Sequence, residues 1–271
     1  MFLFSDLQMT IAHLALLIAQ DSGGIGFDDH GGELELYDLN MTNAEASSPE
    51  PFVVGTIVTT TRFASIGWAK TSDPKYSLGI IAGGMIDGTV QIWDPQAILK
   101  GEDALIATIK DHAGGPVKAL EFNTMEPHML ATGGSDGQVL IVDLTNPSQP
   151  LISTPSGEQT KGAEVTQVAW NSQVAHIVAV AGSDGLVTVW DLKSKRPWCA
   201  LRADGFAISD IAWNPTEGLH LVTASGDDRN PLLKLWDLRA STTMPLATLQ
   251  GHSQGVLALA WCPHDDTLLL S

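Results

Sequence analysis

Five aspartates recur along the chain at near-regular intervals, and carboxylates are side chains able to act as acids, bases or metal ligands. They are separated by 56, 49, 48 and 46 residues and are Asp38, Asp94, Asp143, Asp191 and Asp237. Each closes a short apolar stretch, so all five occupy one repeated position. Repetition at one position predicts hydrogen bonding at a turn or strand end rather than a single catalytic pair.

No other pattern in the sequence indicates catalysis. The chain lacks a GxSxG elbow, an HExxH helix, a Walker phosphate loop and a paired metal motif. Cys199 and Cys262 form no CxxC pair, and no histidine cluster lies near them at zinc spacing. We therefore expect no enzymatic activity, no metal and no cofactor. Two cysteines in 271 residues indicate a reducing compartment.

Two loops carry side chains suited to contact with a partner. The only tight basic cluster in the sequence comprises Lys193, Lys195 and Arg196. It predicts either a solvated hairpin or a contact to an acidic partner or a phosphate. The loop GDDRNP (226–231) presents Asp227, Asp228 and Arg229. This loop is suited to recognition, and equally to the capping of its own turns.

The composition indicates a globular, acidic protein. Of the residues, 44% are hydrophobic, and the net charge is −17 from 31 acidic and 14 basic side chains. This balance repels polyphosphate, so we expect no nucleic-acid partner and no purely electrostatic hold on anionic lipid.

An apolar run near the start of the chain, MTIAHLALLIA (9–19), has the character of a signal-peptide core. Residues 1–20 contain no Lys or Arg, however, and Asp6 lies where a positive charge is expected. The run is also shorter than the roughly 20 residues that span a bilayer. We predict a buried strand and no transmembrane segment.

Internal repetition defines the architecture. Five strand-like segments end alike, namely LELYDL (34–39), VQIWDP (90–95), VLIVDL (139–144), VTVWDL (187–192) and LKLWDL (233–238). Aromatic-ended strands run in phase with them, namely IGW (66–68), LEF (120–122), VAW (168–170), IAW (211–213) and LAW (259–261). Asp-Gly pairs lie between the two markers in GGMIDGTV, GGSDGQV and AGSDGLV, and they predict type I′ hairpin turns. Each unit therefore reads as a four-stranded antiparallel meander.

These units resemble WD repeats, with the repeat tryptophans at Trp93, Trp190 and Trp236. His112 and His252 occupy the Gly-His position that opens a WD blade, where the family uses the histidine in a buried hydrogen-bond network. For His112 the expected partners are Thr132 and Asp136, and Val142 in place of a tryptophan leaves that network incomplete. Both histidines are expected to be structural.

We therefore predict an all-β WD-repeat β-propeller of about five blades plus part of a sixth, at about 40–45 residues per blade. Residues 1–271 form a single incomplete domain with an atypical start at 1–30, blade ends near residues 39, 95, 144, 192 and 238, and a partial blade at 250–271. The chain stops inside what should be the second strand of the sixth blade, and a seven-bladed ring is expected in the parent protein.

From Gly31 to Ser271 the chain resembles the N-terminal propeller of the large outer-coat subunit of the COPII vesicle coat, the Sec thirty-one family. The most specific stretches are VTQVAWNSQVAHIVAVAGSDGLVTVWDLK, ASGDDRNPLLKLWDLR and GHSQGVLALAWCPHDDTLLLS. That family continues into an extra blade, a helical rod and a Pro-rich region, which this sequence does not contain.

The resemblance implies a non-catalytic protein-interaction scaffold of the COPII outer coat in endoplasmic reticulum to Golgi transport. It implies a cytoplasmic protein, peripheral on endoplasmic reticulum exit sites and COPII vesicles. The implied partners of the full-length parent are other coat subunits, including the small WD-repeat outer-coat subunit and further copies of itself.

Two other classes of function remain as alternatives. One is a generic WD-repeat adaptor such as a ubiquitin-ligase substrate receptor, which would usually show a basic degron pocket or an appended linker domain. The other is a propeller enzyme, which needs carboxylates or metal ligands converging on the axis. Fold alone does not decide among these classes.

Overall fold

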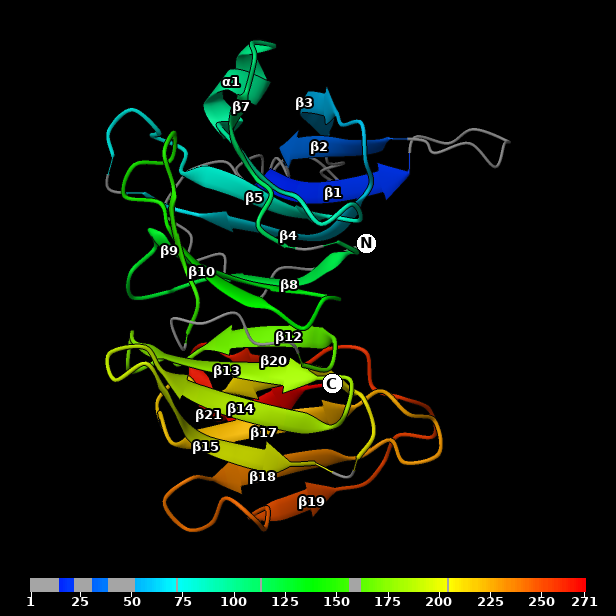
Figure 1. Ribbon diagram of the computed structural model, residues 1–271. Coiled ribbons are helices and arrows are strands. Elements are labelled where there is room, and N and C mark those ends of the chain that lie inside the picture. Colours follow the sequence, from blue (N-terminus) through cyan, green and yellow to red (C-terminus); the bar gives the residue numbers. More distant parts are fainter. Residues whose placement is uncertain are drawn as a thin grey trace.

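The structure, a computed structural model, describes residues 15–21, 31–38, 52–71, 73–112, 114–155, 162–203 and 205–271. The strands in these ranges form six sheets (Figure 1). The first sheet holds β1 (Ala15–Asp21), β2 (Gly32–Asp38) and β3 (Phe52–Val58), and the last holds β20 (Ala260–Cys262) and β21 (Asp265–Leu270).

Four complete sheets of four strands lie between them. The first of the four comprises β4 (Phe63–Ala69), β5 (Ile80–Met85), β6 (Val90–Trp93) and β7 (Leu105–Ile109). The next comprises β8 (Val117–Phe122), β9 (Met129–Gly134), β10 (Val139–Asp143) and β11 (Leu151–Ser153). The third comprises β12 (Val165–Trp170), β13 (Ile177–Gly182), β14 (Leu186–Asp191) and β15 (Arg196–Arg202). The fourth comprises β16 (Ile208–Trp213), β17 (His220–Ser225), β18 (Leu233–Asp237) and β19 (Ala247–Leu249).

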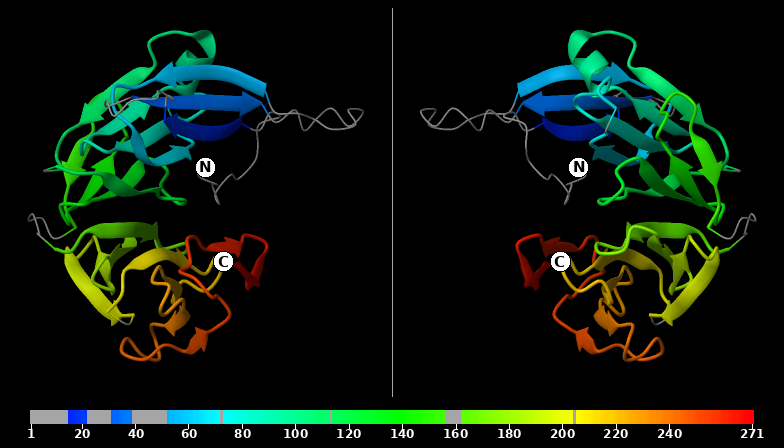
Figure 2. Two further views of the ribbon diagram at one scale, coloured as in Figure 1. Left: turned by 90° about the vertical axis from the view of Figure 1, so that its right-hand side faces the viewer. Right: turned by 90° about the vertical axis from the view of Figure 1, so that its left-hand side faces the viewer.

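The sheets follow one another round an open curve, as Figure 2 shows, with the first sheet (blue) and the last (red) on the two sides of the opening. Within each sheet the strands pair antiparallel in chain order. The first strands of successive sheets, β4, β8, β12 and β16, contact one another and form the inner ring. The predicted all-β propeller without a closed ring is confirmed.

The core lies between sheets, because each sheet has apolar residues on both faces. One cluster joins β12–β15 to β16–β19 through Val189, Leu201, Leu221 and Trp236, all of them fully buried. Another joins β8–β11 to β12–β15 and includes Trp170. A single four-stranded sheet cannot cover both of its own faces, so stacking of neighbours stabilises the fold.

In the first sheet, β1 takes the place of the second strand of the complete sheets, because β2 ends at the repeated Asp38 as β10, β14 and β18 end at theirs. β1 pairs with β2 from Ala15 opposite Asp38 to Asp21 opposite Gly32, and it contacts β4 of the next sheet. It overlaps the predicted strand at 9–19, of which residues 9–14 lie outside the described ranges.

The Asp-Gly hairpins differ from the predicted type I′ turn. Lys195 is the only non-glycine residue with a positive φ among the described residues. Asp87, Asp136 and Asp184 therefore all have negative φ. The left-handed residue is the glycine that follows each aspartate, and the Gly88 and Gly137 N–H groups bond carbonyls three residues back. This is the pattern of a type I turn followed by a left-handed glycine, which also matches strand twist.

One helix, α1 (Pro95–Lys100), is described, on the link from β6 to β7. Asp94 caps it, since its Oδ1 accepts the Gln96 N–H at 2.8 Å, and Pro95 starts the first turn. Gly101 ends it with φ 68°.

Candidate protein-interaction surface

Antiparallel strands give the propeller two opposite faces. One face carries the turns of Gly88, Gly137 and Gly185, and we call it the glycine-turn face. In each four-stranded sheet the third strand runs away from those turns and leads to a repeated aspartate on the other side, so we call that side the aspartate face.

The repeated aspartates hold the turns that follow them. Asp143 Oδ1 accepts from Thr145 N at 2.8 Å, Asp191 Oδ1 from Lys193 N at 2.9 Å and Asp237 Oδ1 from Arg239 N at 3.0 Å. Asp94 makes the same contact as the cap of α1. The backbone N–H of Arg239 lowers the pKa of Asp237 below its ordinary value. Asp38 ends β2 at the equivalent place in the first sheet.

The WD hydrogen-bond network is divided between two sheets. His112 Nε2 lies 3.0 Å from Thr132 Oγ1, and His112 Nδ1 lies 3.4 Å from Asp136 Oδ1, the two partners expected from the sequence. Burial lowers the pKa of His112, against the opposing effect of Asp136. In the sheet β16–β19, the Trp236 indole instead donates to Thr223 Oγ1 at 3.1 Å. His252 is exposed, with Nε2 at 2.8 Å from Ser271 Oγ.

The tryptophans lie at the sheet interfaces. Trp93 and Trp236 are buried and Trp190 packs partly buried on the same kind of interface. The tryptophans that end inner strands donate to the preceding inner strand, Trp170 to the Glu121 carbonyl and Trp213 to the Ala169 carbonyl, both at 3.0 Å. These side chains join sheets, so they are not free to stack on a ligand.

A further repeated residue was missed in the sequence, the asparagine directly after the inner strand. Asn123 Nδ2 donates to the Ala175 carbonyl and Asn171 Nδ2 to the Gly218 carbonyl, both at 2.7 Å, and Asn214 does the same to Asp266 at 2.9 Å. Each thus connects its own loop to the loop of the next sheet. The signal was present in EFN, AWN and AWN, one residue beyond the aromatic marker.

Asp210 was also missed, because it occurs in one repeat only. Its carboxylate is 8% exposed and accepts from Gln167 Nε2 at 2.9 Å and from Leu259 N at 2.6 Å. Burial raises the pKa of Asp210, and these hydrogen bonds act in the opposite direction. The side chain connects three successive sheets.

The basic cluster lies on the turn between β14 and β15, on the aspartate face. Lys193, Lys195 and Arg196 are all exposed. Asp191 Oδ1 accepts from the N–H groups of both Lys193 and Ser194, which fixes the turn.

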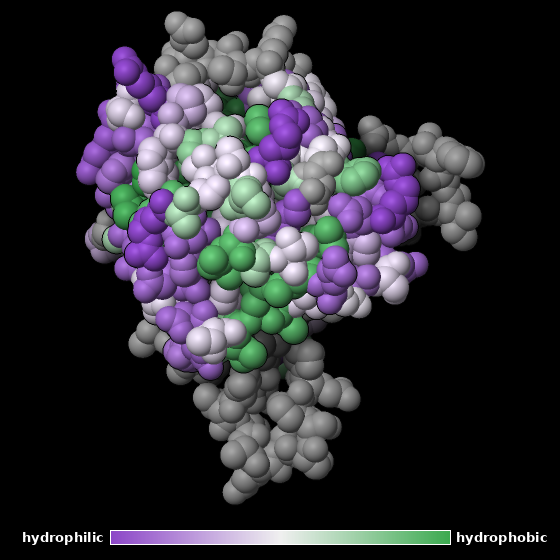
Figure 3. Space-filling model, turned by 90° about the horizontal axis from the view of Figure 1, so that it is seen from below, coloured by the Kyte–Doolittle hydropathy of each residue, from purple (hydrophilic) through white to green (hydrophobic). Residues whose placement is uncertain are grey.

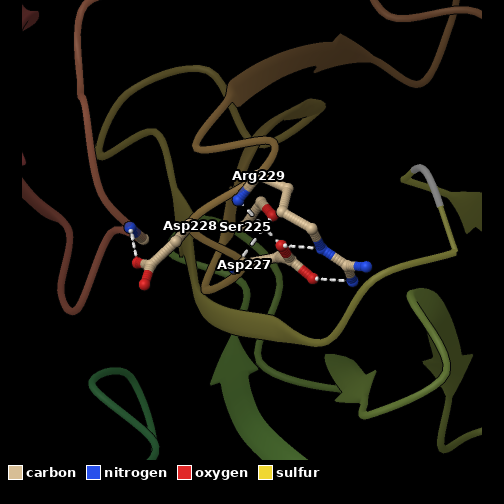
Figure 4. Close-up of polar contacts among 5 residues, drawn as sticks. Ser225, Asp227, Asp228 and Arg229 are labelled. Carbon is tan, nitrogen blue, oxygen red and sulfur yellow. Dashed lines mark hydrogen bonds and ion pairs between the residues drawn. The ribbon is translucent and has the colours of Figure 1, made fainter.

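The loop 226–231 lies on the glycine-turn face, between β17 and β18 (Figure 4). Asp227 and Arg229 form a bidentate pair with the shorter contact at 2.6 Å, and this pair lowers the pKa of Asp227 to about 2. Asp228 Oδ1 accepts the Gly255 N–H at 2.8 Å, which connects the loop to the last sheet. Both aspartates therefore cap local structure, and the Arg229 side chain remains 78% exposed.

The structure thus separates the two loops suited to partner contact. Its described His–Asp pairs, such as His220 and Asp237 at 3.7 Å, each lie within a single sheet. In the described ranges, no group of three or more His, Cys, Asp or Glu residues could hold a metal ion. No described helix is long and apolar enough to cross a membrane. These features define a WD-repeat β-propeller domain with its two candidate loops on opposite faces.

Comparisons with known proteins agree with this class. A model described as "Nucleolar protein 10-like, N-terminal domain" matches residues 35–224, and a WD domain, G-beta repeat model matches residues 243–271. Protein transport protein sec31 of Neurospora crassa is 42% identical over 96% of this chain, and SEC31 of Dictyostelium discoideum is 39% identical over 92%. The chain spans about one fifth of the length of these curated relatives, 20% and 19% respectively.

A solved structure titled "COPII on membranes, outer coat vertex" matches with a TM-score of 0.73 and 30% identity, over 94% of this chain and 66% of that chain. The chain belongs to the β-propeller family described as "Nucleolar protein 10-like, N-terminal domain", and it is a homologue of the SEC31 propeller. The resemblance seen in the sequence is confirmed.

Proposed function

We propose that this domain is a non-catalytic protein-interaction scaffold of the COPII outer coat. The observation that carries the proposal is identity of 39–42% to SEC31 proteins along nearly the whole propeller, together with the fold match to an outer coat vertex.

The side-chain geometry supports a scaffold rather than an enzyme. The repeated aspartates cap turns, His112 bonds a buried threonine, and Asp210 accepts bonds from neighbouring sheets. In these arrangements each polar group is used to hold a strand or turn in place, and the exposed loops are left for contact with partners.

The proposal extends to place and partners. A homologue of coat proteins without a described membrane-spanning helix is suited to a cytoplasmic protein that reaches the membrane through the coat. We propose association with endoplasmic reticulum exit sites and COPII vesicles. The proposed partners are other coat subunits, including the small WD-repeat outer-coat subunit and further copies of the same protein.

The test is co-precipitation of the natural protein that contains this chain, tagged at its own locus. Coat subunits should be recovered with it, and the tagged protein should lie at endoplasmic reticulum exit sites in microscopy. The control variant Trp236→Ala removes a fully buried side chain and should lose recovery through unfolding. Recovery of ubiquitin-ligase subunits in the absence of coat subunits would contradict the proposal.

A further inference from the structure

A groove lies on the aspartate face between the sheets β8–β11 and β12–β15. It has a volume of about 490 Å³ and is formed by the loop after β8, the loop after β12 and the β14–β15 turn. Its lining residues include Met129, Trp170, Val174, Leu192 and Lys193.

The apolar part of the groove is rigid and partly uncovered. Asn123 Nδ2 donates to the Ala175 carbonyl, which holds the two loops together, and Asn171 Oδ1 accepts the Val174 N–H at 2.9 Å. Val174, which lines the groove, is 36% exposed. A preformed groove with uncovered apolar side chains is suited to an apolar anchor of a partner, because little ordering is needed on binding.

One rim of the groove is basic. Lys193 lines it, and Lys195 and Arg196 follow on the same turn, so three of the 14 basic residues of a chain with net charge −17 gather here. Glu126 also lines the groove, from the loop after β8. The Asp191 carboxylate accepts from the turn N–H groups and lies 4.0 Å from His176. On the β14–β15 side of the groove the three cations therefore outnumber the single carboxylate of Asp191.

We propose that this groove binds an extended peptide segment of a partner protein in which a bulky apolar residue is followed by acidic residues. The apolar residue would fill the hollow beside Val174 and Leu192, and the acidic residues would pair with the basic rim. The proposal rests on the proposed role as a protein-interaction domain, and it names the partner chemistry of one site.

The test is selection from a random 12-residue peptide library displayed on phage, with the 271-residue chain as target. Peptides that bind the unaltered chain should combine a bulky apolar residue with neighbouring Asp or Glu. Their affinity should fall about tenfold in the triple variant Lys193→Gln, Lys195→Asn, Arg196→Gln, and it should weaken with rising salt. Asparagine is chosen at 195 because Lys195 has φ 55°.

A charge-matched control separates this site from the overall charge. The variant Lys70→Gln, Lys100→Gln, Lys110→Gln removes three exposed cations outside the groove and should bind selected peptides within about twofold of the original chain. The variant Val174→Asp should lower the affinity without touching the basic rim. Enrichment of neutral or basic peptides, equal loss in both triple variants, or no enrichment would overturn the proposal. None of these results depends on recovery of coat subunits, so the two proposals can fail separately.

Discussion

His112 shows how a titratable group serves the fold rather than a reaction. Its side chain is fully buried, and burial lowers its pKa against the effect of Asp136. In the unfolded chain the ordinary histidine pKa is about 6.5. The folded state therefore binds the proton less readily than the unfolded chain does. The contribution of His112 to the free energy of unfolding is fully present above about pH 6.5 and is lost as the pH falls below that value.

The substitution His112→Gln should remove this acid sensitivity. We expect the variant to be less stable at pH 7.5, because the contact to Thr132 is altered, and to lose less stability than the original between pH 7 and pH 5. Thermal unfolding followed by circular dichroism across this pH range measures both effects. The exposed His252→Gln is the control, and an unchanged pH profile in His112→Gln would contradict the assignment.

Asp210 is a buried carboxylate whose effect on the free energy of unfolding can be measured. Its Oδ1 accepts from Gln167 Nε2 and Ile211 N, and its Oδ2 accepts from Leu259 N, so all of these partners are donors. Burial raises its pKa, which shows that the charged form is costly there. In Asp210→Asn the charge is gone, but an amide N–H then faces another donor.

The unfavourable contact between the new amide N–H and a neighbouring N–H should outweigh the gain from removing the buried charge. Asp210→Asn should therefore lower the free energy of unfolding by about 1–3 kcal/mol in urea titrations. Asp103→Asn is the control, because exposed Asp103 accepts only from the backbone N–H of Leu105 among the hydrogen bonds described. A stabilised Asp210→Asn would mean that desolvation outweighs the hydrogen bonds.

At the scale of elements, glycines with positive φ differ in how much a larger residue costs at their position. Gly137 has φ 75°. A Cβ there would lie 2.4 Å from the carbonyl oxygen of Gly162, in the segment that leads into β12 of the next sheet. Gly101 also has positive φ, at 68°, but a Cβ there meets nothing within 4 Å. The two positions share backbone strain and differ in steric contact.

We expect Gly101→Ala to cost about 1 kcal/mol, from strain alone, and Gly137→Ala to cost clearly more. Urea unfolding of the two variants side by side measures the difference. Equal costs would mean that the loop around Gly162 moves aside without penalty.

The repeat markers predicted the strands because their cause is local. Alternation of apolar residues and the aromatic at the end of β8, β12 and β16 are visible in the sequence, and those strands lie where the markers are. The type of the Asp-Gly turn was wrong, because three-residue and two-residue hairpins share the same dipeptide and differ only in backbone angles. The strand β1 carries no repeat marker, so its pairing with β2 could not be read from repetition.

The candidate sites were predicted to a smaller extent. The partners of His112 followed from the repeat, and so did the turn role of the aspartates. The bridge from Asn171 to Gly218 and the contacts of Asp210 join residues more than 40 positions apart, which no single repeat contains. The groove arises in the same way, since it exists only where loops of two sheets meet.

At the scale of the whole molecule, the protection of backbone amides from hydrogen exchange should vary from sheet to sheet. The sheet β12–β15 packs on neighbours on both sides, whereas the last sheet, β20–β21, contacts the chain through β16 on one side. Figure 3, viewed from below, shows hydrophobic side chains gathered on that face of the molecule. Exposed apolar residues in the last part of the chain include Leu249, Leu257, Leu268 and Leu270.

Hydrogen exchange should therefore be slowest in β9 and β13 and fastest in β20 and β21, because sheets stacked in a row open from the side with fewer neighbours. Mass spectrometry of peptic fragments after exchange measures this order. Uniform protection across all described sheets would show that the propeller opens as one unit.

The placement of the Lys193–Arg196 turn and the 226–231 loop on opposite faces has a consequence for valency. A partner bound at the Lys193–Arg196 turn would leave the 226–231 loop free, so a domain that used both loops could bind two neighbours at once. In an assembly of many copies, each first contact raises the effective concentration for the second, and weak individual bonds then add up to a durable lattice.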